Sequence, residues 1–506
     1  MQDRSALIDD VRRHTRSLPP NSLPSMTSRE RLSVHENGVS LVIVAAFAVA
    51  YGALTFAATP HTIDTFPDSH TYLPVSFLGH AERLWAIPVI YYIAGNSVGR
   101  VVVQTIIGLV SWIVLAVQFG AVLQNRMIRY SAQIWLLLLA LSAPVLQWNR
   151  IILSESLSIS FTVLLFAAGL RLVRRTDVGS VALFLLAAIL WTFSRQVDAF
   201  ITAGLAVPIF VLAWRRPHSR RLAFWTALGV ILIGIWGTVT TFQTSTVSPG
   251  HLAPTNPSEA QLAGIVQFRA ATDPAELNYF RAHGLPETPA LKIPPPFSTV
   301  GQPVNVDQFA NPYAEYRLAD DPQFKRWANR EGQSVYLKYL VSHPWAPLAQ
   351  TTLNAPRLMT MNPDYVSTLA IPSWISTLVY GNLSSEPSPN TGSGAPRSSD
   401  PVYADVLFAL GICLFLLAAR RRRLNGVVWT TVVAVIFSGL WALAVWSFAA
   451  TELPREFIET AVLFHIALIA VLLTSLDVIV SNGTGQSRTR PTVASLAPDV
   501  SSSRVV

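Results

Sequence analysis

Apolar residues recur along this chain in blocks of about 20, a length that matches the hydrocarbon core of a bilayer when the block is helical. Hydrophobic residues make up 51% of the chain and charged residues only 13%. Backbone polar groups find no water in lipid, so such blocks are expected to form helices, which satisfy those groups internally. The sequence therefore predicts an all-α polytopic membrane protein.

The block pattern predicts about ten transmembrane helices. They fall at residues 39–58, 101–123, 131–147, 155–172, 178–193, 199–214, 222–241, 403–419, 426–447 and 457–478. The predicted organisation is an N-terminal bundle at 39–241, an outer segment at 242–402 and C-terminal helices at 403–480. Residues 1–38 and 481–506 are polar and read as disordered cytoplasmic tails.

Basic residues set the expected orientation. With the N-terminus inside, the short inner loops carry 13 arginines, namely Arg126, Arg129, Arg171, Arg174, Arg175, Arg215, Arg216, Arg220, Arg221 and Arg420 to Arg423. The short outer turns carry only Arg150, Arg195 and Arg455. Because positive residues are retained on the cytoplasmic side, this asymmetry places both termini in the cytoplasm of a cell that bears the protein in its inner or plasma membrane.

The first outer loop, residues 59–100, contains an apolar segment that is too short to span. Residues 84–94 include Pro88 and are flanked by charge, which favours a helix lying on the membrane surface. The loop also holds the acidic stretch "TFPDSHTYLPVS", with Asp64 just before it and Asp68 within it. We expect short interfacial helices and a cluster of polar side chains here.

The second outer segment, residues 242–402, is rich in proline and is expected to fold as a small extracytoplasmic domain. Residues 323–341 have a helical pattern that should end at His343, because the residue before Pro344 disfavours helical geometry. Residues 366–380 form an apolar patch expected at the membrane, and residues 383–401 read as a low-complexity linker.

Ionisable residues gather at the predicted outer ends of the spans. They are Asp64, Asp68, Glu82, Arg83, Arg150, Glu155, Arg195, Asp198, Glu452, Arg455, Glu456 and Glu459. As single residues they are explained by helix caps, interfacial arginines and surface ion pairs worth about 0–1 kcal/mol each. Charges at membrane depth usually face one another or a cavity, so the whole set indicates a shared polar site on the outer side.

The order of several short motifs resembles that of the GT-C superfamily of integral-membrane glycosyltransferases, which includes protein mannosyltransferases and aminoarabinose transferases. The motifs are "PDSHTY" after the first span, "RLWAIPVIYYI", "LSESLSISF", "SRQ", and Glu452-x-x-Arg455 before the last span. The resemblance covers about residues 39–240 and 403–480. Ser69 follows Asp68 where many members have a second acid, and Glu456-Phe457 follows Arg455 in place of an aromatic residue.

The resemblance implies site residues at matching positions. Asp68 would be the catalytic base, with Asp64 as its rival, and Glu155 would join the catalytic set. Arg83, Arg195 and Arg455 would bind the lipid phosphate of the donor. The expected pocket residues are His70, Tyr72, Asp198 and Glu452.

The implied reaction moves a sugar from a polyprenyl-phosphate donor to an envelope glycan, lipid or protein, in the context of cell-wall biogenesis. A carboxylate would take the proton of the acceptor hydroxyl, and arginines would stabilise the departing phosphate. Asp64, Asp68 and His70 leave open a divalent cation as cofactor. The +8 net charge lies mostly on the cytoplasmic side, so anionic lipid and not nucleic acid is the expected partner. A transporter or flippase for a lipid-linked substrate, or a non-catalytic envelope scaffold, are the alternatives.

Overall fold

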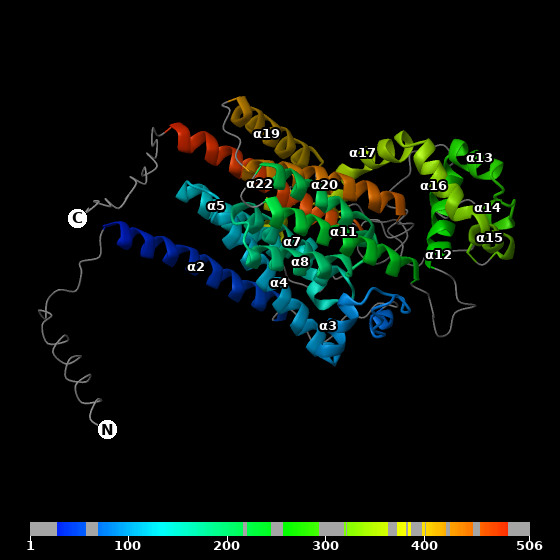
Figure 1. Ribbon diagram of the computed structural model, residues 1–506, viewed down its shortest axis with the longest axis horizontal. Coiled ribbons are helices and arrows are strands. Elements are labelled where there is room, and N and C mark those ends of the chain that lie inside the picture. Colours follow the sequence, from blue (N-terminus) through cyan, green and yellow to red (C-terminus); the bar gives the residue numbers. More distant parts are fainter. Residues whose placement is uncertain are drawn as a thin grey trace, which may run out of the picture. The chain divides into compact units, whose positions relative to one another are not determined.

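The computed structural model describes residues 28–56, 69–215, 220–243, 257–292, 318–319, 321–362, 372–380, 383–385, 397–399, 401–420, 426–448 and 456–483. Residues up to Val49 and residues from Ala50 onward form separate compact units. The described chain is helical throughout, apart from three strands of two or three residues (Figure 1).

The first half of the chain supplies most of the long helices. In chain order its elements are α2 (Ser28–Phe56), η1 (Ser69–Tyr72), α3 (Ala86–Ala94), α4 (Ser97–Gly120), α5 (Arg126–Leu141), α6 (Ala143–Leu146), η2 (Gln147–Arg150), α7 (Glu155–Arg174), α8 (Val178–Thr192), α9 (Gln196–Thr202), η3 (Ala203–Leu205), α10 (Ala206–Arg215) and α11 (Arg220–Gln243).

The second half begins with shorter helices and ends with three long ones. Its elements are α12 (Pro257–Gly264), η5 (Ile265–Arg269), η6 (Ala270–Thr272), α13 (Pro274–Ala282), α14 (Pro289–Lys292), α15 (Pro322–Trp327), η8 (Ala328–Gly332), α16 (Gln333–Ser342), α17 (Trp345–Thr360), β1 (Met361–Asn362), α18 (Ser373–Tyr380), β2 (Leu383–Ser385), β3 (Arg397–Ser399), α19 (Pro401–Arg420), α20 (Gly426–Phe448) and α22 (Ile458–Gly483). Strand β3 pairs antiparallel with both β1 and β2.

Six described helices are long and apolar enough to cross a membrane, which supports a multi-pass membrane protein. They lie in α2, α4, α7, α11, α20 and α22. A seventh span results if α5 and the helix after it count as one, although the two are bent by 56°. The bend falls at Ser142, whose backbone is extended (ψ 151°), and at Pro144, which has no N–H to donate.

The other predicted spans differ from simple long helices. The segment predicted at 178–193 is the 15-residue helix α8. The segment predicted at 199–214 is not continuous, because α9 gives way to the 3₁₀ turn η3 before α10 begins. The segment predicted at 403–419 is the 20-residue helix α19. These segments are helical, and their crossing of the bilayer remains a prediction.

Helix α7 lies at the centre of the bundle and packs against α4, α8, α20 and α22. It is buried along most of its length, more than the other candidate spans. Its first turns, "ESLSISF", alternate small serines with apolar residues, so neighbouring helix backbones can approach closely. Helix α7 therefore carries its N-terminal residue, Glu155, into the interior of the protein.

The described part of the loop predicted as the first outer loop, residues 69–96, folds onto the ends of neighbouring helices, and its apolar segment 84–94 forms a helix too short to span. Helix α3 has only nine residues and exposes Tyr92 and Ile93. The backbone N–H of Ala86 donates to the carbonyl of Phe193 at 3.2 Å, and the Trp85 ring lies 5.1 Å from the Phe193 ring. This loop is thereby fixed to the turn between α8 and α9.

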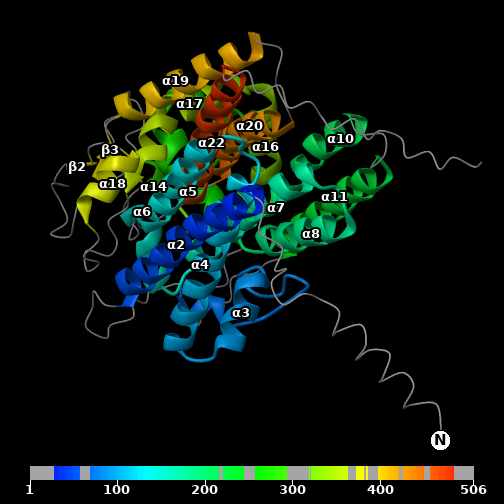
Figure 2. The same ribbon diagram turned by 90° about the vertical axis from the view of Figure 1, so that its left-hand side faces the viewer.

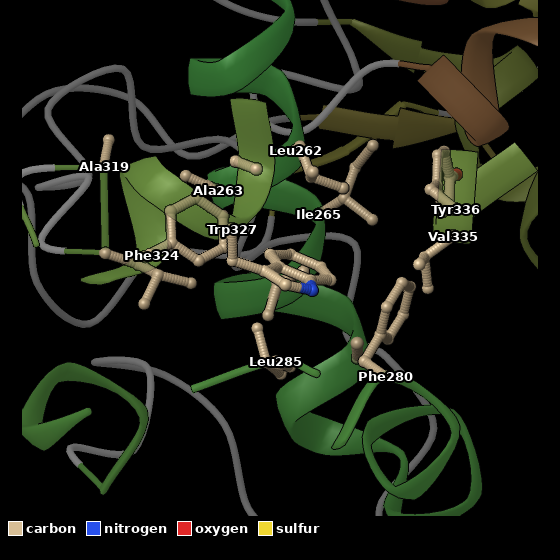
Figure 3. Close-up of a cluster of buried hydrophobic side chains, with 14 of the residues drawn as sticks. Leu262, Ala263, Ile265, Phe280, Leu285, Ala319, Phe324, Trp327, Val335 and Tyr336 are labelled. Atoms are coloured by element: carbon tan, nitrogen blue, oxygen red, sulfur yellow. The ribbon is translucent and has the colours of Figure 1, made fainter. Parts of the chain in front are cut away.

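A small domain, called the outer domain after its predicted location, is built from α12 to α16 around its own apolar core (Figures 1 and 3). Phe280, Phe324 and Trp327 meet in this core, which also includes Leu262 and Tyr336. The helix predicted at 323–341 is present as α15, the π-helical turn η8 and α16, and it ends before His343 as expected.

Arg269 attaches this outer domain to helix α20. Its side chain is 4% exposed and donates to the carbonyls of Trp446 and Ser447 at the end of α20, and to the hydroxyl of Tyr336 at 3.1 Å. The Tyr336 hydroxyl also donates to the carbonyl of Ser447. Carbonyls at a helix C-terminus lack intrahelical donors, so a buried guanidinium is a suitable partner.

Stability of the outer domain is predicted to depend on the protonation of Glu276. Burial raises the pKa of this carboxyl to about 7, while Arg269 opposes the rise. An unfolded glutamate titrates at about 4.3, so ionisation destabilises the folded state as pH rises from about 4 to about 7. We expect Glu276→Gln to be more stable than wild type by up to about 3 kcal/mol above that range, with the difference vanishing in acid.

Thermal unfolding of the purified full-length protein between about pH 5 and about pH 8 measures this difference. The control is Glu331→Gln, which alters an exposed glutamate of the same domain and should follow wild type at every pH. A Glu276→Gln curve parallel to that of wild type would contradict the prediction.

Candidate functional site

Arg195 is the centre of a buried charge cluster. It lies in the turn between α8 and α9, where its backbone is extended (φ −142°, ψ 150°), and its side chain is 9% exposed. Nη1 donates to Glu459 Oε1 at 2.8 Å, Nη2 pairs with Glu456 Oε2, and Glu155 Oε1 lies 4.0 Å from Nη2. Arg195, Glu155, Asp198, Glu456 and Glu459 are together called the Arg195 cluster.

The Arg195 cluster has more acid than base. Four carboxylates against one guanidinium give a formal charge of −3 when all are ionised (1 − 4). Glu155 and Glu459 are fully buried and Asp198 is 1% exposed. Burying charges costs several kcal/mol per ion unless each has partners, and the contacts of Arg195 with Glu155, Glu456 and Glu459 lower that cost.

The positions of the acids on their helices offset part of this excess. Glu155 is the first residue of α7, Glu459 lies in the first turn of α22, and Asp198 lies in the first turn of α9. The N-terminus of a helix has a partial positive charge and unpaired N–H groups, which favour carboxylates. Three helix starts at one place therefore lower the cost of burying these carboxylates.

Two serines support the carboxylates. Ser194 Oγ lies 3.0 Å from Asp198 Oδ2 and 3.2 Å from Ser158 Oγ. Asp198 Oδ1 and Glu459 Oε2 are buried and have no hydrogen-bond partner among the described residues. The cluster therefore keeps acceptor atoms for a proton, a water molecule or a polar ligand.

The first outer loop reaches the same place through Tyr72. The Tyr72 hydroxyl donates to Ser154 Oγ at 3.1 Å, directly before Glu155, and Ser69 Oγ donates to the carbonyl of Ile152 at 2.7 Å. Arg83 Nε donates to Thr71 Oγ1 at 2.8 Å, and its guanidinium lies 4.8 Å from the centre of the Tyr72 ring. Two sequence-predicted residues, Tyr72 and Arg83, are thereby placed next to the start of α7.

A buried amide network fixes the turn that leads to Glu155. Gln104 Nε2 donates to the carbonyls of Asn149 at 2.6 Å and Ile151 at 3.1 Å, while the Tyr91 hydroxyl lies 2.7 Å from Gln104 Oε1. Asn149 Nδ2 donates to the Tyr51 hydroxyl at 2.7 Å. Sequence reasoning missed Gln104 and Asn149, although an amide inside the apolar block 101–123 is itself a signal of a buried polar contact.

The structure brings together Tyr72, Arg83, Glu155, Arg195 and Asp198 from the sequence-predicted set. It adds Glu456 and Glu459, which the sequence marks as outer charges without a role. His70 is exposed. Asp64, Asp68, Glu452 and Arg455 lie outside the described residues, so their placement stays a prediction. Among the residues that are described, no three His, Cys, Asp or Glu side chains are arranged to hold a metal ion.

Arg195 has a different geometry from that expected of a phosphate ligand. Both of its terminal nitrogens are engaged by carboxylates, from Glu456 and Glu459. An incoming phosphate would have to displace one of these acids and would meet the remaining negative charge. In this arrangement Arg195 is the counter-ion of Glu456 and Glu459 and positions the start of α22. Binding of the donor phosphate by Arg195 stays a prediction.

Comparison of the chain with models of protein families, with curated proteins and with solved structures gives no significant match.

Proposed function

We propose that the protein is a membrane glycosyltransferase of the GT-C type, which transfers a sugar from a polyprenyl-phosphate donor to an acceptor on the outer side of the membrane. The observation that carries the proposal is the convergence of separate outer segments. The first outer loop, the start of α7, the turn before α9 and the start of α22 are connected through Tyr72–Ser154, Glu155–Arg195 and Arg195–Glu459. These are the segments in which the motif resemblance lies.

In the proposed reaction, the acceptor hydroxyl oxygen attacks the anomeric carbon as the bond from that carbon to the phosphate oxygen breaks. The hydroxyl proton passes to the carboxylate of Asp68, with Asp64 as the alternative base. The polyprenyl phosphate leaves with the bonding electron pair, and attack from the opposite face inverts the anomeric centre. Arg83 and Arg455 stabilise the negative charge that grows on the phosphate.

The Arg195 cluster has a positioning role in this proposal. Glu456 directly follows Arg455 in the chain and is paired with Arg195. Fixing Glu456 restricts where the backbone of Arg455 can go, because consecutive Cα atoms are only about 3.8 Å apart. Likewise, Ser69 directly follows Asp68 and is bonded to Ile152. The described neighbours of both key residues are thus attached to the framework around Glu155.

Substitution of Arg455 tests the proposed phosphate contact. Arg455→Lys keeps the charge but loses the planar fork that binds phosphate through two N–H groups, and Arg455→Ala loses both. Loss of one transition-state contact typically lowers the rate by about 10² to 10³. We expect the order of turnover Arg, then Lys, then Ala, measured with a short-chain polyprenyl-phosphate sugar and normalised to folded protein. Unchanged turnover in Arg455→Ala would remove Arg455 from the site.

The proposed orientation puts residues 242–402 outside and both termini in the cytoplasm. In a Cys413→Ser background, single cysteines at Ser388 and Asn425 are expected to react with a membrane-impermeant maleimide from opposite sides of the membrane. Cys413 is the one cysteine of the chain, so the background is free of other thiols. Labelling of both positions from the same side would contradict the orientation.

A transporter of a lipid-linked substrate is the second candidate, and the buried acid excess of the Arg195 cluster favours it. Carboxylates in the membrane commonly mark ion or proton pathways. However, Glu155 and Glu459 lie at helix starts and not in mid-span, whereas transporter sites usually lie near the bilayer midplane. Movement of a fluorescent polyprenyl-phosphate lipid across proteoliposome membranes, without release of its sugar, would identify this activity.

A further inference from the structure

Helix α17 belongs to the outer segment of the chain but packs against transmembrane helices. It lies beside α19, α20 and α22 (Figures 1 and 2). Trp446 Nε1 of α20 donates to Gln350 Oε1 of α17 at 3.2 Å. Trp446 is two residues from the end of the 23-residue helix α20, which is long enough to cross the hydrocarbon core of about 30 Å. At Gln350, helix α17 therefore lies level with the end of the hydrocarbon core.

The side of α17 that faces away from these helices is apolar and exposed. Trp345 is 77% exposed and Leu353 is 78% exposed, and Leu348 lies between them on the same side. At 100° per residue these three side chains fall within one sector of about 140°, away from Gln350 and from the buried Thr351. No ionisable residue occurs between Trp345 and Leu353.

Helix α18 repeats this arrangement on another part of the bundle. It packs against α5 and α6, and the backbone N–H of Ala143, at the bend between those helices, donates to Ser376 Oγ at 3.1 Å. Trp374 is 59% exposed and Leu378 is 40% exposed, and their spacing of four residues places them on one face. The sequence of α18, "SWISTLVY", has no residue that is charged at neutral pH.

We propose that α17 and α18 are immersed in the outer leaflet, with the exposed faces of Trp345, Leu353, Trp374 and Leu378 in contact with lipid. Two exposed tryptophans next to the ends of spans match the preference of this side chain for the interface between headgroups and acyl chains. Helix α20, against which α17 packs, also has an exposed apolar side chain, Leu440, which is 57% exposed. The water-exposed outer domain then ends at Ser342, and α17 and α18 attach the chain that follows it to the bilayer.

Collision accessibility of nitroxide spin labels tests this placement in the full-length protein reconstituted in phosphatidylcholine–phosphatidylglycerol nanodiscs. Single cysteines replace Trp345, Leu353 or Leu378 in a Cys413→Ser background. Oxygen partitions into lipid, and the nickel chelate NiEDDA stays in water. We expect these labels to collide frequently with oxygen. Their collision rate with NiEDDA should be as low as that of a reference label at Leu440.

A label at Glu287, a 55% exposed side chain of the outer domain, is the aqueous control and should collide freely with NiEDDA. NiEDDA accessibility at Leu353 equal to that at Glu287 would show that α17 faces water and would overturn the proposal. Low accessibility to both reagents would overturn it too, because the face would then be covered by a second copy or a partner protein. Neither result depends on glycosyl transfer, so the placement and the proposed function are tested separately.

Discussion

Replacing Arg195 with leucine is expected to destabilise the protein by about 3–5 kcal/mol, the range found when one partner of a buried ion pair is removed. The substitution removes the guanidinium that contacts Glu456 and the fully buried Glu459, and that lies 4.0 Å from the fully buried Glu155. The cost arises from the acids that remain and not from the lost attraction alone. Arg195→Lys should lose less stability than Arg195→Leu, because it keeps a positive charge. It should still be less stable than wild type, because lysine has no planar fork to bind two carboxylates.

A matched control is present in the outer domain. Arg281 and Glu287 form an ion pair at 2.6 Å, but their side chains are 41% and 55% exposed. Surface pairs are worth about 0–1 kcal/mol, so Arg281→Leu should unfold close to wild type. Combining Arg195→Leu with Glu459→Gln should recover part of the lost stability, since one uncompensated charge is gone. Equal unfolding temperatures for Arg195→Leu and Arg281→Leu in the same detergent would contradict the importance assigned to the Arg195 cluster.

Asp68→Asn is expected to lower glycosyl transfer by about 10² to 10⁴, the usual contribution of a general base. The amide keeps the shape of the side chain but cannot accept the proton of the acceptor hydroxyl. Donor binding should survive, because the phosphate contacts are assigned to arginines. Asp64→Asn should retain more activity than Asp68→Asn.

The measurement is initial transfer rate at saturating donor, with donor affinity determined separately on the same preparations. A larger loss of transfer rate in Asp64→Asn than in Asp68→Asn would make Asp64 the general base in place of Asp68. Full activity in both single variants would remove the acidic stretch of the first outer loop from the mechanism.

Hydropathy predicts where the helices lie better than it predicts their continuity. The block at 199–214 is uniformly apolar, yet its helix is interrupted at Ala203–Leu205. Its neighbour α11 approaches closely there: a Cβ added at Gly234 would lie 2.9 Å from the backbone nitrogen of Ala203. Such packing against another helix is not encoded in the apolar pattern of either segment, so the 3₁₀ turn could not be predicted from that pattern.

Part of the site was accessible from sequence for a physical reason. Glu155, Arg195 and Asp198 are charges in strongly apolar surroundings, and such charges must find partners. The sequence assigns Glu459 no role of its own, because an acid in the first turn of a helix is also what an ordinary helix start contains. The partner of Arg269 could not be predicted, because it consists of main-chain carbonyls at Trp446 and Ser447, which any sequence provides.

The central claim is that this protein consumes a polyprenyl-phosphate sugar, and release of free polyprenyl phosphate by the purified wild-type protein tests it most directly. A panel of short-chain polyprenyl-phosphate hexoses and pentoses, offered with envelope glycans and lipids as acceptors, should include at least one donor from which wild type releases polyprenyl phosphate. The Asp64→Asn, Asp68→Asn double variant, folded to the same extent, should release none above background. Equal release by wild type and the double variant, or no release by folded wild type from any donor of the panel, would contradict the account.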